Sequence, residues 1–415
     1  MNPILPRNHF VPDGEAHVMP DGRLYLYGSY DLSGCREYCS DVLHVFSTDD
    51  MLHWVDHGVA FRSADVPWAP EGSALYAPDC IHRDGKYYLY FCMNNAIEGV
   101  AVSDSPAGPF TDPSPILHAD GDSIDPAVFI DDDGQAYYYW GQFSLRGAKL
   151  NKDMRTLDES TINRRVIDEK RHGFHEGASM RKRGDLYYLV FTDITRGRAT
   201  SLGYAVSKSP LGPFEYKGII IDNIGCDPQT WNDHGSIEEY KGQWYVFYHR
   251  STQNGVTCRR MCAEPIFFDE NGDIREVLPT TQGAEPPISV SRAIAAADAC
   301  RMGGWGASAR IMPDPLCSGE EVLSHAAGSG WAVYRYVDFD RPVSSAVLTM
   351  ESSGSGAVEI WADNELLGEI PVRPTDGERR EFSGGIHAAQ GVHALYLEWK
   401  LEKGAQAEIK SIRFE

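Results

Sequence analysis

GFHEGASMRKRGDLYYLVFTD, residues 173–193, is the stretch that decides the fold. Residues 186–191 are almost wholly apolar or aromatic, which predicts a strand buried in a sheet. Glu176 stands between His175 and Gly177, just ahead of that strand. A carboxylate at the edge of a buried sheet needs a site or a partner that stabilises its charge. Alone the motif is ambiguous, but the same construction recurs along the chain.

A turn containing glycine, followed by an aromatic-rich strand, occurs five times. The five segments are DGRLYLYGS (21–29), DGKYYLYFC (84–92), DGQAYYYWG (133–141), RGDLYYLVF (183–191) and KGQWYVFYH (241–249). Two further segments, SDSPAGPF (103–110) and SKSPLGPF (207–214), are nearly identical and strengthen the repeat. This spacing predicts one propeller blade per repeat, with insertions.

Each repeat also opens with a short strand headed by a polar side chain. In a propeller the first strand of every blade lines the central channel, so equivalent positions converge on one axis. We therefore expect one mouth of the channel to collect four acids and a histidine: Asp13, Asp79, Asp125, Glu176 and His234.

The length of 415 residues predicts two domains. Residues 1–286 carry the five repeats and are expected to form a five-bladed β-propeller. Residues 287–415 contain short alternating strands such as WAVYRYVDF, GAVEIWADN and HALYLEWKL, which are typical of an antiparallel, jelly-roll-like β-sandwich. The predicted fold class is all-β.

The formal charge of −22 and the pI near 5.0 argue against nucleic acid or membrane as a partner. The start MNPILPRNHF has no apolar segment typical of a signal peptide. Nine cysteines fit reduced thiols, although Cys35, Cys39, Cys258 and Cys262 have spacings that a metal site could use. We expect a cytoplasmic protein that is a monomer or a small homo-oligomer.

Four motifs in this order carry a resemblance to a known family. They are VPDGEAHV (11–18), SIDPAVFIDDDGQAYYYWG (123–141), HEGASM (175–180) and NDHGSIEEYKGQWYVFYHR (232–250). Together with the repeats they resemble glycoside hydrolase family 43, over about the first 285 residues. The resemblance implies a five-bladed propeller and an inverting enzyme that acts on oligosaccharides containing arabinose or xylose.

The resemblance also assigns roles to three carboxylates. It implies that Asp13 is the general base, that Glu176 is the general acid, and that Asp125 orients and electrostatically tunes the acid. The implied activity is exo-acting release of terminal pentoses, first as an α-L-arabinofuranosidase, then as a β-D-xylosidase, and less as a β-D-galactofuranosidase. No cofactor is required for this chemistry.

The chemistry itself needs two separated carboxylates. One deprotonates a water and the other protonates the leaving oxygen, at a separation of about 6.5–9.5 Å. Other readings stay open: Asp13 as a turn residue, Asp125 as an extended residue before proline, and Glu176 as an ion-pair partner of an arginine. A non-catalytic glycan-binding propeller is the alternative from a different class.

Sugar binding is expected to use aromatic faces and hydrogen-bonding side chains. The candidates are Trp68, Tyr76, Gln142, Phe143, Arg250 and Arg259. In the family resembled, the histidine at His234 helps to hold a calcium ion near the propeller axis, largely through waters. A core histidine hydrogen-bonded to a neighbour is the alternative, because calcium prefers oxygen ligands.

The C-terminal region resembles a family 6 carbohydrate-binding module across about its last 85 residues. Its opening SRAIAAADACRM lacks the acid pair that holds a structural calcium in that family, and its end lacks the aromatic of the ligand cleft. Glycan binding and a packing role beside the propeller are both open, with Trp305 and Trp331 as the aromatic platforms to examine.

Overall fold

The computed structural model describes residues 1–118, 124–304, 309–325 and 328–415. Strands account for nearly all of the regular structure, and the one α-helix within these ranges is the single turn α1 (Glu169–His172). Three short 3₁₀ segments complete the elements: η1 (Ser63–Asp65), η2 (Glu159–Thr161) and η3 (Ala296–Asp298). The prediction of an all-β fold is confirmed. Among the described residues, no helix has the length and apolar character needed to cross a bilayer.

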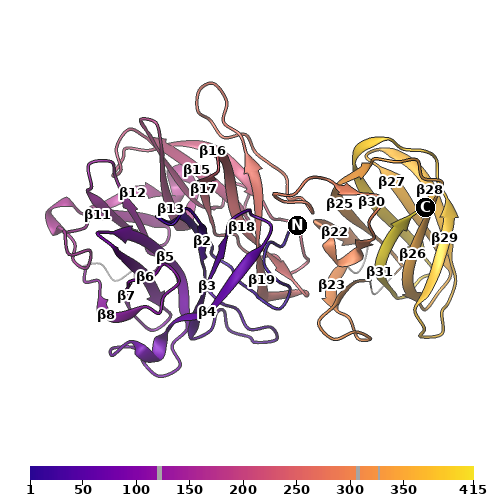
Figure 1. Cartoon of the computed structure of the whole chain (residues 1–415), viewed down its shortest axis with the longest axis horizontal. Coiled ribbons are helices and arrows are strands. Elements are labelled where there is room, and N and C mark those ends of the chain that lie inside the picture. The colour runs from indigo at the N-terminus through magenta and orange to yellow at the C-terminus, as the bar shows by residue number, and fades with distance from the viewer. Residues whose placement is uncertain (119–123, 305–308, 326–327) are drawn as a thin grey trace.

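Five antiparallel sheets form the larger lobe in Figure 1, and each is built from strands consecutive in the chain. The sheets are β1 (Glu15–Val18), β2 (Leu24–Tyr27), β3 (Val42–Thr48) and β4 (Trp54–Arg62); β5 (Leu75–Arg83), β6 (Lys86–Met93), β7 (Ala96–Ser103) and β8 (Thr111–Pro115); β9 (Ala127–Ile130), β10 (Ala136–Trp140), β11 (Ser144–Lys149) and β12 (Asn163–Asp168); β13 (Phe174–Arg183), β14 (Leu186–Asp193), β15 (Ser201–Ser207) and β16 (Glu215–Asp222); and β17 (Ser236–Tyr240), β18 (Gln243–Thr252) and β19 (Gly255–Ile266).

The first strands of the five sheets form a closed ring. β1 contacts β5, β5 contacts β9, β9 contacts β13, β13 contacts β17, and β17 returns to contact β1. This is the arrangement of a propeller, with the first strand of each sheet beside the axis. The hairpin that leaves each first strand holds one of the predicted glycines in a left-handed conformation that side chains with a Cβ rarely adopt: Gly22, Gly85, Gly134, Gly184 and Gly242, with φ between 60° and 83°.

Apolar clusters fill the five spaces between neighbouring sheets. β14 explains why the middle strand of a blade reads as one apolar run. Its Leu189 and Phe191 pack into the cluster shared with the third sheet, whereas Tyr188 and Val190 pack into the cluster shared with the fifth. Since successive side chains of a strand point to opposite faces, both faces of this strand are buried.

Two further sheets form the smaller lobe. One has the order β20-β25-β30-β27-β28 with β22 beside β25, and the other has the order β23-β24-β31-β26-β29 with β21 beside β31. Their strands are β20 (Ile288–Ser289), β21 (Ile294–Ala295), β22 (Arg301–Gly304), β23 (Arg310–Pro313), β24 (Glu321–His325), β25 (Ser329–Phe339), β26 (Ser345–Ser352), β27 (Gly356–Ala362), β28 (Glu365–Val372), β29 (Arg380–Gly385), β30 (Gly391–Leu401) and β31 (Ala407–Phe414).

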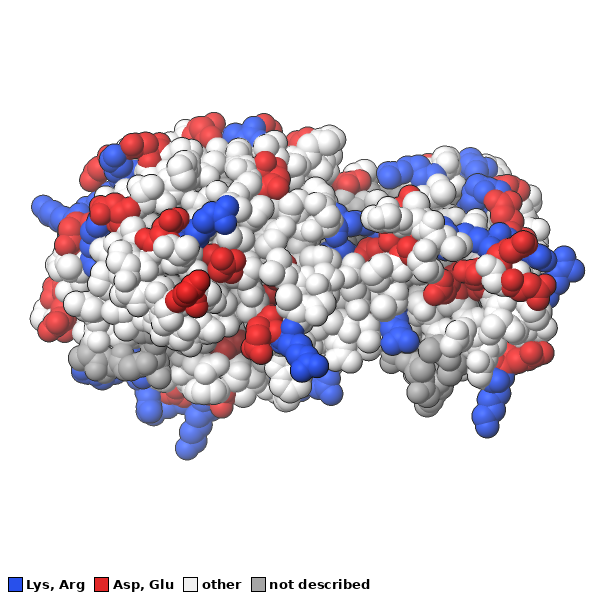
Figure 2. Space-filling model, turned by 90° about the horizontal axis from the view of Figure 1, so that it is seen from below, with Lys and Arg blue, Asp and Glu red and all other residues white. Residues whose placement is uncertain are grey.

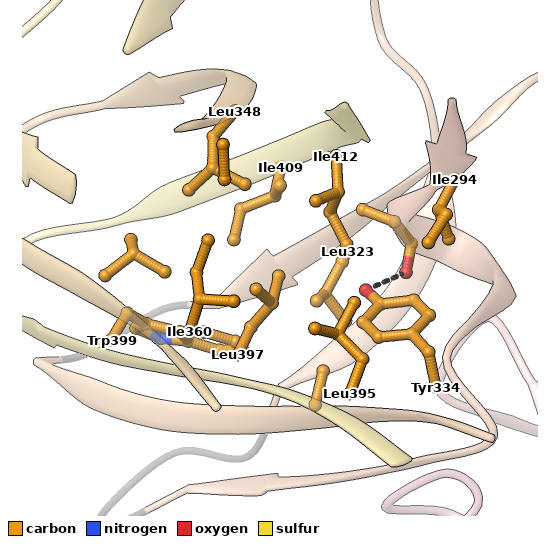
Figure 3. Close-up of a cluster of buried hydrophobic side chains, with 14 of the residues drawn as sticks. Ile294, Leu323, Tyr334, Leu348, Ile360, Leu395, Leu397, Trp399, Ile409 and Ile412 are labelled. Carbon is orange, nitrogen blue, oxygen red and sulfur yellow. Dashed lines mark hydrogen bonds between the residues drawn. The ribbon is translucent and has the colours of Figure 1, made fainter. Parts of the chain in front are cut away.

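The two sheets pack face to face as a sandwich around one apolar cluster (Figure 3). Ile360 and Leu397 come from one sheet, and Leu348 and Ile409 come from the other. At the edge of the cluster the buried Tyr334 hydroxyl donates to the carbonyl of Ala296 at 2.8 Å. Of the two predicted aromatic platforms, Trp331 lies on β25 in a half-buried position, and Trp305 lies outside the described residues.

Glu321, at the start of β24, joins the sandwich to the propeller. Its carboxylate accepts from Arg260 at 3.0 Å, from Arg7 at 2.9 Å and from Gln253 at 2.9 Å. The side chains of Glu321 and Arg260 are only 4% and 3% exposed. Burial alone would raise the pKa of Glu321, but Arg260, Gln253 and Arg7 outweigh it and lower the pKa. The carboxylate therefore stays ionised between the lobes.

Replacing Glu321 should test how much this contact stabilises the protein. Glu321→Ala leaves Arg260 buried without its anion, so we expect the free energy of unfolding to fall by about 3–5 kcal/mol in denaturant titration. The neighbouring Glu320 is 54% exposed and pairs with Lys410, so Glu320→Ala should change the free energy of unfolding far less than Glu321→Ala. Equal losses in the two variants would contradict this role for Glu321.

Candidate active site

A pocket of about 470 Å³ opens at one mouth of the propeller channel. Residues from all five blades line it, and they include the three predicted carboxylates and the predicted histidine. The lining residues are Asp13, Tyr38, Tyr76, Cys92, Met93, Asn94, Ile124, Asp125, Gln142, His175, Glu176, Ala199, Trp231, Asn232, His234 and Arg259. Four of the five polar residues expected at one mouth of the channel therefore line this pocket.

Asp13 lies just before β1 and is held as an anion. Its Oδ2 accepts from the Ser29 hydroxyl at 2.6 Å, and its Oδ1 accepts from Arg259 Nη1 at 3.2 Å. Burial alone would raise the pKa of Asp13, but Arg259, His234 and His249 together hold the pKa below its ordinary value. A buried, ionised carboxylate with a free approach from the pocket is suited to accept a proton.

Arg259 is itself fixed by Asp31, a residue that the sequence reasoning missed. The guanidinium forms a two-point contact, Nε to Oδ2 and Nη2 to Oδ1, both at 2.9 Å. Asp31 follows Ser29 by two positions, so the segment after β2 supplies two supports for the Asp13 carboxylate. The sequence offers two signals for this role: Asp31 is close to Ser29, and it follows the end of a strand. Neither signal is specific.

Asp125 lies just before β9 and is 7% exposed. In contrast to Asp13, its surroundings favour the protonated carboxyl group. Burial raises the pKa of its carboxyl well above the ordinary value, and the nearby Glu176 and Asp13 raise it further. Two neighbouring carboxylates disfavour double ionisation, so a proton is retained in this part of the pocket. The sequence analysis gave Asp125 the role of tuning the pKa of Glu176, and the structure raises the pKa of Asp125 itself.

Glu176 reaches the pocket because β13 is irregular at that point. The pairing with β14 shifts register on both sides of Glu176, and such bulges redirect side chains. Gln142 Nε2 donates to its Oε2 at 2.7 Å, which fixes the carboxyl from the third sheet. The glycine of the HEG motif is also explained: Gly177 has φ +66°, and a Cβ there would lie 2.8 Å from the His234 ring.

His234 is 6% exposed, and its Nδ1 lies 3.8 Å from Asp13 Oδ1. Burial lowers the pKa of this imidazole, against the opposing effect of Asp13 and Glu176. Among the described residues, two groups of three side chains have metal-binding spacing, and His234 belongs to neither. The Asp13 oxygen nearest His234 already accepts from the Arg259 cation. The donor set therefore does not fit a direct calcium site, and a calcium ion held through waters near His234 stays a prediction.

Asp79 does not join this mouth, contrary to the sequence-based expectation. It lies deeper in the channel, where its Oδ1 is 2.7 Å from His17 Nε2 and its Oδ2 accepts from the Val128 amide at 2.7 Å. Asp79 precedes its turn glycine by fewer residues than the other four, and three residues of strand correspond to about 10 Å. Tyr76, three residues earlier, takes the place in the pocket.

Three predicted sugar-binding residues, Tyr76, Gln142 and Arg259, line the pocket. Phe143 is beside it, 52% exposed, with its ring edge-on to His175 at 5.1 Å. Residues that sequence reasoning missed include Tyr38, His175 and the 69% exposed Trp231. Trp231 stands three positions before His234, and that closeness to a recognised motif was the available signal.

Two predicted sugar-binding residues lie elsewhere, which corrects those assignments. Trp68 donates its indole N–H to the Ile97 carbonyl at 3.1 Å and packs against the cluster between the first two sheets. Arg250 is 1% exposed and donates to the Ala299 carbonyl of the sandwich at 2.9 Å. Strand alternation turns Arg250 away from the pocket and toward the second lobe.

All nine cysteines are free, and neither group of described residues with metal-binding spacing contains a cysteine.

Known proteins share this architecture. The family model for glycosyl hydrolases family 43 matches residues 1–274. A xylosidase/arabinosidase from Thermoclostridium stercorarium is 31% identical, with 96% of each chain covered. A solved β-xylosidase/α-arabinofuranosidase of this family from a compost metagenome, in a calcium-free complex with xylotriose, is 32% identical with a TM-score of 0.59 and covers 67% of this chain and 97% of that one.

A Bacillus subtilis arabinoxylan arabinofuranohydrolase structure covers 100% of this chain and 97% of its own length at 24% identity and a TM-score of 0.58, which shows a shared fold for both lobes. The propeller with its carboxylate-lined mouth thus has the architecture of a carbohydrate-active enzyme. On the family match, the chain belongs to glycosyl hydrolases family 43.

The protonation of Asp125 should appear in the pH dependence of stability. Because the pKa of Asp125 is raised in the folded protein, ionising it costs stability that the unfolded chain does not pay. This cost is absent below about pH 4, the ordinary range of an aspartate, and grows as pH rises. Asp125→Asn removes the cost, so we expect Tm to rise at pH 7 and to change little at pH 4.

The control for this experiment is Asp84→Asn, whose side chain is 90% exposed in a turn. It should give no difference that depends on pH. A Tm gain for Asp125→Asn that is equal at pH 4 and pH 7, or a loss at pH 7, would show that Asp125 is not held protonated by its surroundings.

Proposed function

We propose that the protein is an inverting, exo-acting glycoside hydrolase that removes terminal pentose residues from oligosaccharides. The observation that carries this is the pair of carboxyl groups in one pocket with opposite environments: Asp13 bound to an arginine, and Glu176 bound to an amide beside the proton-retaining Asp125. α-L-Arabinofuranosidase is the first choice and β-D-xylosidase the second. The combined name of the Thermoclostridium relative supports either activity, or both in one pocket.

In the proposed reaction, Asp13 takes a proton from a water molecule, and that water attacks the anomeric carbon of the terminal sugar. Glu176 gives its proton to the glycosidic oxygen as the carbon–oxygen bond breaks on the opposite face, so configuration inverts. Asp13 ends protonated and Glu176 ionised, and a proton passes back through solvent. Asp125 orients the acid, and Gln142 holds its carboxyl group.

A pocket that is open at one end suits a chain end rather than the middle of a glycan. Tyr76, Gln142 and Arg259 line the pocket and are proposed to contact the terminal sugar. A non-catalytic glycan-binding propeller is the alternative. Glycan binding alone does not need one carboxyl group with a lowered pKa, Asp13, near another with a raised pKa, Asp125. This arrangement therefore favours the enzyme.

We further propose that residues 1–286 form the catalytic domain and that residues 287–415 form a sandwich of the carbohydrate-binding-module type. The contacts of Glu321 and Arg250 between the lobes favour a packing role for the sandwich. No step of the proposed reaction uses a metal ion bound at His234.

The activity test is hydrolysis of three aryl glycosides, the α-L-arabinofuranoside, the β-D-xylopyranoside and the β-D-galactofuranoside, by wild type and Glu176→Ala. We expect turnover of the arabinofuranoside or the xyloside, with a loss of about 10²–10⁴-fold in kcat/KM for the variant, which lacks the proton donor. No turnover of any substrate by folded wild-type protein would favour the glycan-binding alternative.

The role of Asp13 is tested by the pH dependence of kcat/KM. Arg259 is the largest influence that lowers the Asp13 pKa against burial, so Arg259→Met should raise that pKa. The base must be ionised to act, and the acidic limb of the profile should therefore move to higher pH. Arg259→Lys, which keeps a cation, should move it less. Movement of the alkaline limb alone would assign Asp13 a different role.

A further inference from the structure

The geometry points to a divalent transition-metal site, of the Zn²⁺ class, formed beside the first sheet by His9, which precedes β1, His44 of β3 and Asp56 of β4. Asp56 Oδ2 lies 3.5 Å from His9 Nε2, and Asp56 Oδ1 lies 3.3 Å from His44 Nδ1. The three ligand atoms are all within 4.8 Å of one another. Zn²⁺ bonds to nitrogen and oxygen are about 2.0–2.2 Å long, so neighbouring ligand atoms around the ion stand about 3.3–3.5 Å apart.

These contacts are loose for direct hydrogen bonds. Good hydrogen bonds between nitrogen and oxygen are about 2.7–3.2 Å long, whereas His44 makes a long hydrogen bond of 3.3 Å to Asp56 Oδ1 and His9 stands 3.5 Å from the other oxygen, Oδ2. Two imidazoles and one carboxylate are three of the four ligands that Zn²⁺ takes, and they leave one position for water. Asp56 is the most exposed of the three, so solvent reaches the position where that water would bind.

Surrounding groups orient the ligands as outer partners do in metal sites. His9 Nδ1 lies 3.0 Å from the Tyr30 hydroxyl, and a proton donated there leaves the lone pair on Nε2, which accepts from the exposed Asn8 amide at 3.3 Å until an ion replaces that contact. The Tyr30 ring stacks on the His44 ring at 4.3 Å. The Gly58 amide donates to Asp56 Oδ1 at 2.7 Å, and the pairing of β3 with β4 shifts register on both sides of His44.

The other group with metal-binding spacing, Glu15, His17 and Asp79, already has a cation beside it. Arg181 Nη2 lies 3.2 Å from Glu15 Oε2, so a guanidinium already supplies the positive charge there. In the described part of the chain, the ion pairs of Asp56 are with His9 and His44 alone. The first-sheet cluster is the one with an uncompensated carboxylate.

A bound ion would also brace the proposed catalytic base. The carbonyl of Phe10, next to His9, accepts from the Asp31 amide at 2.8 Å, and Asp31 holds Arg259. Tyr30 stands between Ser29 and Asp31, the two residues that support Asp13. This link to catalysis rests on the proposed function, whereas metal binding itself does not.

The test uses the full-length protein after treatment with a chelator, titrated with Zn²⁺ alone in a background of Cys35→Ser and Cys317→Ser, which removes the exposed thiols. We expect one equivalent of Zn²⁺ to bind and to raise Tm, and Co²⁺ to give the visible absorption of a tetrahedral complex. Asp56→Asn and His44→Gln should each weaken Zn²⁺ binding on the order of 100-fold. His53→Ala is the matched control, since His53 is 86% exposed, pairs with Asp50 and should leave binding unchanged.

Absence of stoichiometric Zn²⁺ binding in the parent protein would overturn the inference. So would unchanged binding in Asp56→Asn, a conservative change at a partly exposed position that keeps the fold. Equal loss in His53→Ala would point to non-specific binding by surface histidines. Hydrolysis of the aryl glycosides, measured on the same samples, separates a failure of this site from a failure of the proposed function.

Discussion

Closure of the five-sheet ring buries charged side chains along its channel, and the candidate active site depends on how that charge is balanced. Ionised carboxylates in such a place cost several kcal/mol unless they are paired. Near the pocket, Arg259 balances the negative charge by binding Asp31 at two points and Asp13 at one. Deeper in the channel, Arg181 balances the negative charge of Glu15 and Glu238. Two arginines thus permit an axis built from acids.

The same constraint separates the two aspartates of the mouth. Asp13 and Asp125 are both buried and both adopt left-handed backbone conformations, with φ of 58° and 53°. Such conformations cost on the order of 1 kcal/mol or more, and the surrounding ring maintains them. Asp13 faces a guanidinium and stays ionised, whereas Asp125 faces carboxylates and keeps a proton. Environment, rather than residue type, gives the pocket an acidic side and a basic side.

The sandwich is attached where the propeller is least complete. The fifth sheet has three strands rather than four, and its Arg250 and Arg260 both contact the sandwich, at Ala299 and Glu321. Charge elsewhere is dispersed: Figure 2 shows acidic and basic side chains interspersed over both lobes on the face that it displays. The buried contact, not a broad charged surface, connects the two parts.

The sequence by itself determined the repeated hairpins, the all-β class and the three carboxylates of the mouth. These rest on local signals: a glycine in each turn, an unbroken apolar run in each middle strand, and a polar residue eight or nine positions before the turn glycine. Only the tertiary structure decided that Asp79 lies deeper, that Arg250 and Trp68 face away from the pocket, and that Asp31 and Trp231 belong to its surroundings. Those outcomes depend on strand register, bulges and partners distant in the chain, and a one-residue change of register turns a side chain to the opposite face.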